Sequence, residues 1–294
     1  SEYGLNGGSP FLFVYVFTDN NSCEFRDTVE VTIVDPVQAD AGLDDAICED
    51  SVLYTLFGYS PLTGGTWTGP GIVSGTNTFD PQLAGGPGVY TLTYAYGGQT
   101  CRTTDDMDLT VNALPIVDAG LDVSVCIDVP YDLSTQTTTP AIASGGVWSG
   151  SGVTGTIFDP IVVNSPGFIA PLSTTIDLTY SFTDQNNCSN SDVITVTVHA
   201  LDSTVNAGED TIVCNTTIPL QLNGSAGVPG TGVWVGLTPP QTGSGIDPST
   251  GILIPSEYGL NGGSPFLFVY VFTDNNSCEF RDTVEVTIVD PVQA

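Results

Sequence analysis

The sequence predicts an all-β protein of tandem immunoglobulin-like β-sandwich domains that together form an extended rod. Three observations support this fold class. Gly, Pro, Thr, Ser and Asp are abundant, whereas there is one Met and no Lys, a balance typical of strands joined by tight turns. One cysteine-containing motif occurs three times along the chain. Short runs of alternating apolar and polar residues also lie between turn clusters, at spacings typical of sandwiches.

The repeated motif defines the domains. It reads DAGLDDAICED from Asp40, DAGLDVSVCID from Asp118 and NAGEDTIVCNT from Asn206, with starts 78 and 88 residues apart. Each copy is followed by a tryptophan between glycines and then by an Asp-Pro step. Repeat domains are therefore expected at 40–117, 118–205 and 206–294.

The two ends of the chain share one sequence. Residues 1–39 are identical to residues 256–294, an offset of 255. The first 39 residues are therefore expected to be the C-terminal half of a repeat domain whose first half lies upstream. A cassette of three domains, copied without change, explains this identity.

Within 118–205 the alternation predicts six short strands. Ile194, Val196 and Val198 are expected to face the core, because alternate residues of a strand share one face. The strands are expected near 123–127, 131–135, 145–150, 154–158, 175–183 and 192–198. The alternative is another small sandwich topology.

The tryptophans and prolines complete the fold prediction. Trp67, Trp148 and Trp234 occupy equivalent positions and are interpreted as core residues rather than sugar-binding platforms. Joints between domains are very short and carry proline at positions 36, 115 and 291. Proline fixes φ, so these joints predict a semi-rigid rod.

The cysteines predict a disulfide in each domain. The expected pairs are Cys48–Cys101, Cys126–Cys188 and Cys214–Cys278, and the partner of Cys23 is expected outside the chain. Each bridge is expected to stabilise its domain by about 3–4 kcal/mol. Paired cysteines indicate an oxidising, extracytoplasmic setting; the alternative is reduced, buried thiols. Because Cys188 lies eight residues after Tyr180, the bridge is expected at one end of the sandwich.

Charge and motif content exclude several functions. The net charge of −30 argues against nucleic acid, whose phosphates need a basic surface. No apolar run is long enough to insert into a membrane. His199 is the single histidine, and no catalytic triad, GxSxG motif or phosphate-binding glycine loop accompanies it. The sequence therefore predicts that this segment is not an enzyme and needs no cofactor.

Calcium is the one metal that the sequence suggests. Acidic residues gather where two domains begin, and oxygen-rich clusters at such joints could bind Ca²⁺. The candidates are Asp40, Asp44, Asp45, Asp118 and Asp122. The alternative is a solvated acidic surface, and no EF-hand spacing is present.

The motifs AGxDxxxC, WSGxG, an Asp-Pro step, LTYxFTDxNxC and TVxVTV together resemble the repeats of the Bacteroidetes gliding-motility surface adhesin SprB and its relatives. This resemblance covers the whole chain. It implies type IX secretion, filaments attached to the outer membrane, propulsion by the gliding motor and adhesion to surface polysaccharide or the substratum. The secretion signal and membrane-anchoring partner would lie outside this segment.

A recurring triplet resembles the Bacteroidetes O-glycosylation acceptor motif, in which Asp precedes Ser or Thr. Its acceptor residues here are Thr28, Ser51, Ser203, Thr211 and Thr283. The same triplet is ordinary in turns that lead into strands, which is the alternative interpretation.

Two functions follow from these observations. The first is the structural shaft of a giant, repetitive cell-surface adhesin, in which many copies multiply weak binding through effective concentration. The alternative is a carbohydrate-binding or spacer array of a secreted polysaccharide-degrading enzyme. A catalytic domain elsewhere in the protein would favour the enzyme, and further cassettes would favour the filament.

Overall fold

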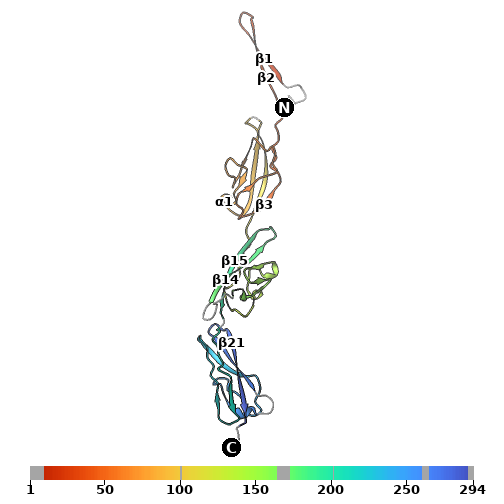
Figure 1. The fold of residues 1–294 in the computed structure, drawn as a ribbon. Coiled ribbons are helices and arrows are strands. Elements are labelled where there is room, and N and C mark those ends of the chain that lie inside the picture. Colours follow the sequence, from red (N-terminus) through yellow and green to blue (C-terminus); the bar gives the residue numbers. More distant parts are fainter. Residues whose placement is uncertain (1–9, 100, 164–172, 201, 260–264, 291–294) are drawn as a thin grey trace. The chain divides into compact units, whose positions relative to one another are not determined.

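The computed structural model describes residues 10–99, 101–163, 173–200, 202–259 and 265–290 (Figure 1). By its internal contacts the chain divides into two compact units. The first comprises residues 1–115 with 184–188, and the second comprises 116–183 with 189–294. The described residues are overwhelmingly strands and turns, which confirms the predicted all-β class.

The first unit begins with an isolated hairpin of β1 (Phe11–Thr18) and β2 (Glu24–Val31). Its apolar side chains are exposed, as Phe13 (42%) and Val29 (59%) illustrate. The same sequence recurs in the second unit, where the equivalent Phe268 and Val284 are 0% and 1% exposed. This hairpin thus has the sequence of a buried sheet but covers no core among the described residues.

The rest of the first unit is a β-sandwich within 40–117. One sheet has the order β3-β8-β7-β5, and β4 pairs with β6 in the other. Its elements are β3 (Asp45–Cys48), β4 (Tyr54–Thr55), β5 (Gly65–Thr68), β6 (Thr78–Phe79), α1 (Pro81–Ala84), β7 (Gly88–Tyr96) and β8 (Thr103–Asn112). The short α1 follows the Asp-Pro step, because Asp80 caps it through the Gln82 and Leu83 amides and proline suits its first turn.

The second unit holds the domain 118–205 apart from residues 184–188, and the domain 206–294, which has the same design. In 118–205 the large sheet has the order β11-β14-β15-β9, and β10, β13 and β12 form the other. Its strands are β9 (Val123–Cys126), β10 (Tyr131–Asp132), β11 (Val147–Ser149), β12 (Val153–Thr154), β13 (Ile157–Phe158), β14 (Ser173–Thr183) and β15 (Ser189–His199), with 3₁₀ turns at Leu133–Thr135, Ile142–Ser144 and Pro160–Val163. The 131–135 strand is thus shorter than predicted, because Asp132 caps a 3₁₀ turn through the Ser134 amide.

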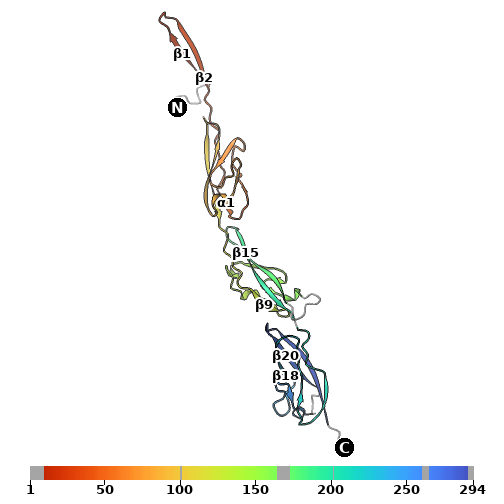
Figure 2. The same cartoon turned by 90° about the vertical axis from the view of Figure 1, so that its left-hand side faces the viewer.

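In 206–294 the large sheet has the order β16-β21-β20-β18, and β17 pairs with β19. The elements are β16 (Thr211–Cys214), β17 (Leu220–Gln221), β18 (Gly230–Gly236), β19 (Ile252–Leu253), α2 (Pro255–Tyr258), β20 (Phe266–Asp274) and β21 (Glu279–Val289). Figure 2 shows β18 and β20 of this sheet, together with β9 and β15 of the preceding domain.

One feature of strand pairing is shared by all three domains. The first strand runs parallel to the last, while the last two strands form a long antiparallel hairpin. Two sheets with this crossover connection enclose one core, as in immunoglobulin-like sandwiches. The predicted tandem β-sandwich fold is therefore confirmed.

Each domain has its own apolar core centred on a tryptophan. Trp67, Trp148 and Trp234 are 7%, 4% and 4% exposed, and each ring lies 5.1 Å from a tyrosine of the neighbouring strand, measured between ring centroids. Ile194, Val196 and Val198 are fully buried. These residues confirm the predicted core assignments.

The glycine two residues before each tryptophan lies against the same tyrosine. A Cβ at Gly65, Gly146 or Gly232 would overlap the hydroxyl of Tyr94, Tyr180 or Tyr270. Tyr94 and Tyr180 are almost completely buried, and their hydroxyls donate to the carbonyl oxygens of Pro61 and Pro140. The close approach of backbone to ring therefore requires glycine.

Gly65→Ala is expected to lower the free energy of unfolding of its domain by about 1–3 kcal/mol, because the extra methyl forces Tyr94 out of its site. Chemical denaturation followed by tryptophan fluorescence measures this loss. Gly98→Ala is the matched control, since a Cβ there meets nothing within 4 Å. Equal stability of the two variants would contradict the packing argument.

Candidate functional site: disulfides between repeats

The two cysteines of a domain lie at opposite ends of its last strand. Cys126 ends β9 and pairs in register with His199, the final residue of β15, whereas Cys188 directly precedes Ser189, the first residue. Because β15 is 11 residues long, about 33–36 Å separates its ends. A disulfide needs Cα atoms within about 7 Å.

The predicted pairs within domains are therefore wrong. The parallel pairing recurs in the other domains, where Cys48 lies level with Asn112 and Cys214 with Val289. Their predicted partners precede the starts of β8 and β21. The predicted pairs Cys48–Cys101, Cys126–Cys188 and Cys214–Cys278 are thus excluded by strand geometry.

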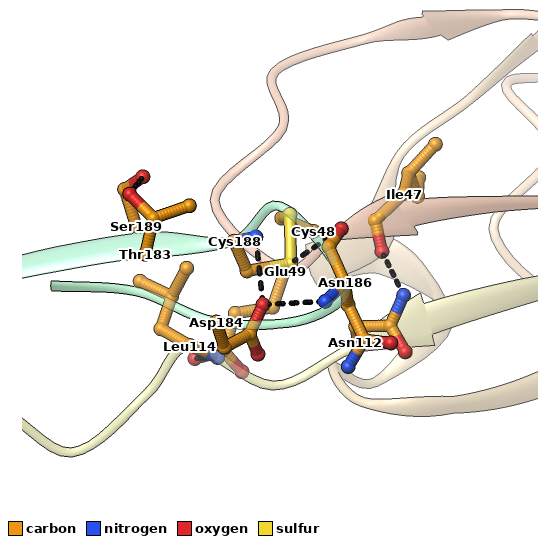
Figure 3. The surroundings of a disulfide bond; sticks show 10 residues. All are labelled: Ile47, Cys48, Glu49, Asn112, Leu114, Thr183, Asp184, Asn186, Cys188 and Ser189. Atoms are coloured by element: carbon orange, nitrogen blue, oxygen red, sulfur yellow. Dashed lines mark hydrogen bonds between the residues drawn. A yellow bond between two sulfur atoms is a disulfide. The ribbon is translucent and has the colours of Figure 1, made fainter. Parts of the chain in front are cut away.

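The disulfides instead join successive repeats. Cys48 bonds Cys188 and Cys126 bonds Cys278, with Cα–Cα separations of 5.6 Å in both. In each pair the first-strand cysteine of one domain meets the hairpin cysteine of the next. Figure 3 shows the first of these bonds, between the end of β3 and the tip of the β14–β15 hairpin.

The hairpin cysteine is held by a tight turn. The Asp184 carboxylate accepts hydrogen bonds from the backbone amides of Asn186 and Cys188, both at 2.9 Å (Figure 3). Asn187 has a φ of 61°, a left-handed conformation that asparagine tolerates better than most residues. An Asx turn of this kind fixes the cysteine at the tip of the hairpin.

The same turn recurs with the sequence Asp-x-Asn-x-Cys. Asp274 accepts from the amides of Asn276 and Cys278, and Asp19 accepts from those of Asn21 and Cys23. These three hairpins therefore present their cysteines in the same way. The Asp-x-Asn-x-Cys motif is visible in the sequence, but its cysteine lies at the opposite end of the last strand from the first-strand cysteine, which the motif does not reveal.

The first-strand cysteine is also held by the sheet. After Cys48, the Glu49 amide donates to the Asn112 carbonyl at 2.9 Å, and the Glu49 carboxylate accepts from the Leu114 amide. Equivalent bonds join the Ile127 amide to His199 and the Asn215 amide to Val289. The cysteine is thus fixed where the chain leaves the domain.

The second disulfide is embedded in apolar contacts. Cys278 is fully buried and packs with Phe272, Phe280 and Val205, in a cluster that also contains Cys126. Nearby, Asp202 is 5% exposed and accepts a hydrogen bond from the Gly227 amide at 3.1 Å. Because thiol–disulfide exchange requires access to sulfur, the burial of Cys278 shields its sulfur from reductants, while Cys126 is half-buried.

Three cysteines of the described residues are free: Cys23, Cys101 and Cys214. The thiol of Cys23 is free, and its expected partner outside the chain stays a prediction. The free thiols of Cys101 and Cys214 contradict the prediction, because their expected partners are bonded to other repeats.

The predicted calcium ligands are engaged by the backbone. Asp40 and Asp118 accept hydrogen bonds from the amides of Gly42 and Gly120, while Asp44 and Asp122 accept from the amides of Asp108 and Thr195. Asp45 accepts from the Ala46 amide and the Tyr54 hydroxyl, and burial together with this bond raises the pKa of Tyr54.

These contacts give the DAGxD motif a structural role, because its second aspartate binds the last strand while its first aspartate fixes the turn within the motif. No group of three or more potential metal-ligating side chains occurs in the part of the chain that the structure describes. Calcium binding stays a prediction, and a melting temperature unchanged by EDTA would exclude it.

A further hydrogen bond joins the alanine of each repeated motif to an aspartate on the last strand of the same domain. Asp105, Asp192 and Asp282 accept from the amides of Ala41, Ala119 and Ala207 at 2.8–2.9 Å. Hydrogen bonds from the Ala119 and Val193 amides lower the pKa of Asp192. A carboxyl whose pKa is depressed by folding stabilises the fold above its unfolded pKa, about 3.9, and this stabilisation is lost as pH falls through the folded pKa.

Asp192→Asn is therefore expected to lower the melting temperature at pH 7, because the neutral amide accepts these hydrogen bonds less strongly. The difference from the unsubstituted chain should shrink as pH falls below 4, where Asp192 itself becomes neutral. Melting curves from pH 7 to pH 2 measure both effects. Asp128→Asn, at an exposed site in the same domain, removes the same charge; an equal loss there would point to net charge instead.

The predicted glycosylation acceptors differ in accessibility. Thr28, Ser203 and Thr283 are exposed, whereas Ser51 and Thr211 are half-buried. Their modification stays a prediction. His199, the single histidine, lies at the end of β15 in register with Cys126. Within the described ranges, no helix is long and apolar enough to cross a membrane.

No family model matches the chain, and no curated protein matches it. Among solved structures, it is similar to titin domains I67–I69 with 13% identity over 87% of this chain and 100% of that one, at a TM-score of 0.31.

Two other similar structures are immunoglobulin domains 1–5 of Sidekick-1 and domains EC1–4 of PcdhgB3. The Sidekick-1 structure is 10% identical over 96% of this chain and 67% of that one, at a TM-score of 0.24. The PcdhgB3 structure is 11% identical over 97% of this chain and 84% of that one, at a TM-score of 0.26. The assignment of the fold therefore rests on strand order and pairing.

Proposed function

We propose that this chain is a tension-bearing shaft segment of an extracellular adhesin. The observation that carries the proposal is that both disulfides join one repeat to the next. A disulfide within a domain strengthens that domain alone. A disulfide between domains passes force from one folded sheet to the next without loading the linker.

The cellular setting follows from the same bonds. Disulfides persist in oxidising compartments, including the cell exterior and the bacterial periplasm. With 33 acidic residues against three basic ones, the surface also disfavours contact with other anionic polymers. Both features suit a segment that spans the space outside a cell.

The resemblance to SprB-type repeats makes the proposal more specific. The segment would belong to a semi-rigid filament that is exported by type IX secretion, attached to the outer membrane and moved by the gliding motor. Adhesion to polysaccharide or the substratum would then come from weak sites repeated along the filament or from its tip.

The alternative of a sugar-binding array finds no support at the tryptophans. All three are buried against tyrosines in the domain cores, so they offer no face on which a sugar ring could stack. Shaft function is therefore favoured over a carbohydrate-binding role for this segment.

The proposal is tested on cells that make this protein. Electron microscopy with antibodies against the domain 118–205 should label filaments outside the cell, and deletion of the gene should remove both the filaments and surface movement. Label in a secreted fraction together with a polysaccharide-degrading activity, and unchanged filaments after deletion, would overturn it.

A further inference from the structure

We infer that Cys214 bonds Cys101 of the next cassette, so that disulfides run without interruption from repeat to repeat. The two cysteines are both free in this chain. The bond between them is expected whether or not the protein is an adhesin. It requires only that cassettes follow one another as they do at residue 39.

The order of domains is visible within the chain. Residues 1–39, which are identical to 256–294, are followed directly by Asp40. The domain that follows the sequence of 206–294 is therefore the domain 40–117. Its hairpin cysteine is Cys101, and the first-strand cysteine of the preceding domain is Cys214.

Cys214 has the same placement as the bonded first-strand cysteines. It ends β16 and pairs in register with Val289, as Cys48 pairs with Asn112 and Cys126 with His199. Its side chain is exposed and its thiol is free. It thus occupies the position from which Cys48 and Cys126 each reach the next repeat.

Cys101 lies where the preceding domain's chain arrives. Two residues later, the Thr103 hydroxyl accepts from the Ala39 amide at 2.9 Å and donates to the Val37 carbonyl at 2.8 Å. The segment that leaves β2 therefore contacts the start of β8, next to Cys101. This is an independent contact that brings Cys101 to the joint between cassettes.

The turn at Cys101 differs from the other hairpins in sequence. Glycines at 97 and 98 replace the Asp-x-Asn tie, and the Cys101 amide donates to the Gly98 carbonyl at 3.2 Å. Gly97 has a φ of 94°, and a Cβ there would overlap the Cys101 carbonyl oxygen. A glycine turn thus takes the place of the Asx turn and still returns the chain at the cysteine.

The same pattern changes the expected partner of Cys23. Cys23 is the copy of Cys278, whose partner is Cys126. The mate of Cys23 is therefore the copy of Cys126 in the preceding cassette, and not the copy of Cys214. Each of the six cysteines in a cassette then has one partner.

The chemistry is a thiol–disulfide exchange. One thiolate attacks an oxidised donor disulfide, such as oxidised glutathione, and displaces one donor thiol. The second thiolate attacks this mixed disulfide and displaces the other donor thiol. The two cysteines lose two protons and two electrons, and the donor gains them as two thiols.

The test uses the full chain extended by a second copy of residues 40–294. Cys23→Ser, Cys101→Ser in the first copy and Cys214→Ser in the second leave one unassigned pair: Cys214 of the first copy and Cys101 of the second. After folding with oxidised glutathione, we expect a monomer with no thiol that iodoacetamide can alkylate. Digestion at acidic residues and mass spectrometry should recover the two linked peptides.

The matched control carries the reverse substitutions, Cys214→Ser in the first copy and Cys101→Ser in the second, again with Cys23→Ser. Its two remaining thiols lie at the far ends and should both be alkylated. Two free thiols in the test chain, linkage only between separate chains, or equal oxidation of the control would overturn the inference. If the substitutions prevent folding, the unsubstituted double cassette provides the test. Five of its cysteines lie outside the observed bonds, so a bond between the two copies leaves three cysteines open to alkylation instead of five.

Discussion

Pulling the oxidised chain from its two ends is expected to extend it far less than pulling the reduced chain. Cys48 and Cys278 are 230 residues apart, which allows about 800 Å when that segment is unfolded and reduced. With both disulfides intact, the shortest covalent path crosses from Cys48 to Cys188, returns along the chain to Cys126 and crosses to Cys278. Only the 62 residues between Cys126 and Cys188 then bear tension, which allows about 220 Å.

The small extension follows from the overlap of the two loops. Without the Cys48–Cys188 bond, the path runs through the 78 residues from Cys48 to Cys126; without the Cys126–Cys278 bond, it runs through the 90 residues from Cys188 to Cys278. Single variants should therefore extend by about 270–320 Å, and the variant without both bonds by about 800 Å. The loss of one bond is thus largely compensated by the other.

Single-molecule force spectroscopy with handles at both ends measures these lengths. Cys48→Ser and Cys278→Ser, separately and together, provide the series, and reduction of the chain under denaturing conditions before refolding should reproduce the double variant. Cys101→Ser is the control, because Cys101 forms no bond in this chain and its substitution should change nothing. A longer extension for that control would restore the pairing within domains.

Much of the fold could be predicted because its signals are local. Alternation in 192–198 identifies the buried face of β15, and the equivalent tryptophans mark three cores. Both follow from the two-residue period of strands. The bond predicted at one end of the sandwich does not form, because Cys188 at one end of β15 bonds Cys48 and Cys126 at the other end bonds Cys278.

The disulfide pairing could not be predicted from the same signals, because it depends on which strands become neighbours. Two cysteines per domain suggest an internal bond until β9 is known to run parallel to β15, which places Cys126 and Cys188 at opposite ends. The backbone bonds of Asp44 and Asp122 could likewise not be predicted, because their amide donors lie 64 and 73 residues away along the chain. Calcium binding at these residues stays a prediction.

Cys48→Ser is expected to lower the stability of the oxidised chain by about 2–5 kcal/mol, since the bond closes a loop with a sequence separation of 140 residues. It should also make Cys188 available to alkylation. Cys188→Ser should cause the same loss, and the double variant should lose no more than either single variant, because one bond is removed in all three. Chemical denaturation of all four chains, followed by tryptophan fluorescence, measures this cycle.

The cycle discriminates between the two pairings through Cys101. If Cys48 bonded Cys101, Cys48→Ser and Cys101→Ser would each remove the same bond, so combining them would lower the free energy of unfolding no further than either alone. Cys188→Ser would then remove a different bond, and its effect would add to that of Cys48→Ser. With the bonds observed here, Cys101→Ser should change stability little, and its combination with Cys48→Ser should be additive because the two side chains share no partner. Non-additivity therefore identifies bonded cysteines by energy, independently of mass mapping, and it should appear for Cys48 with Cys188 and for Cys126 with Cys278.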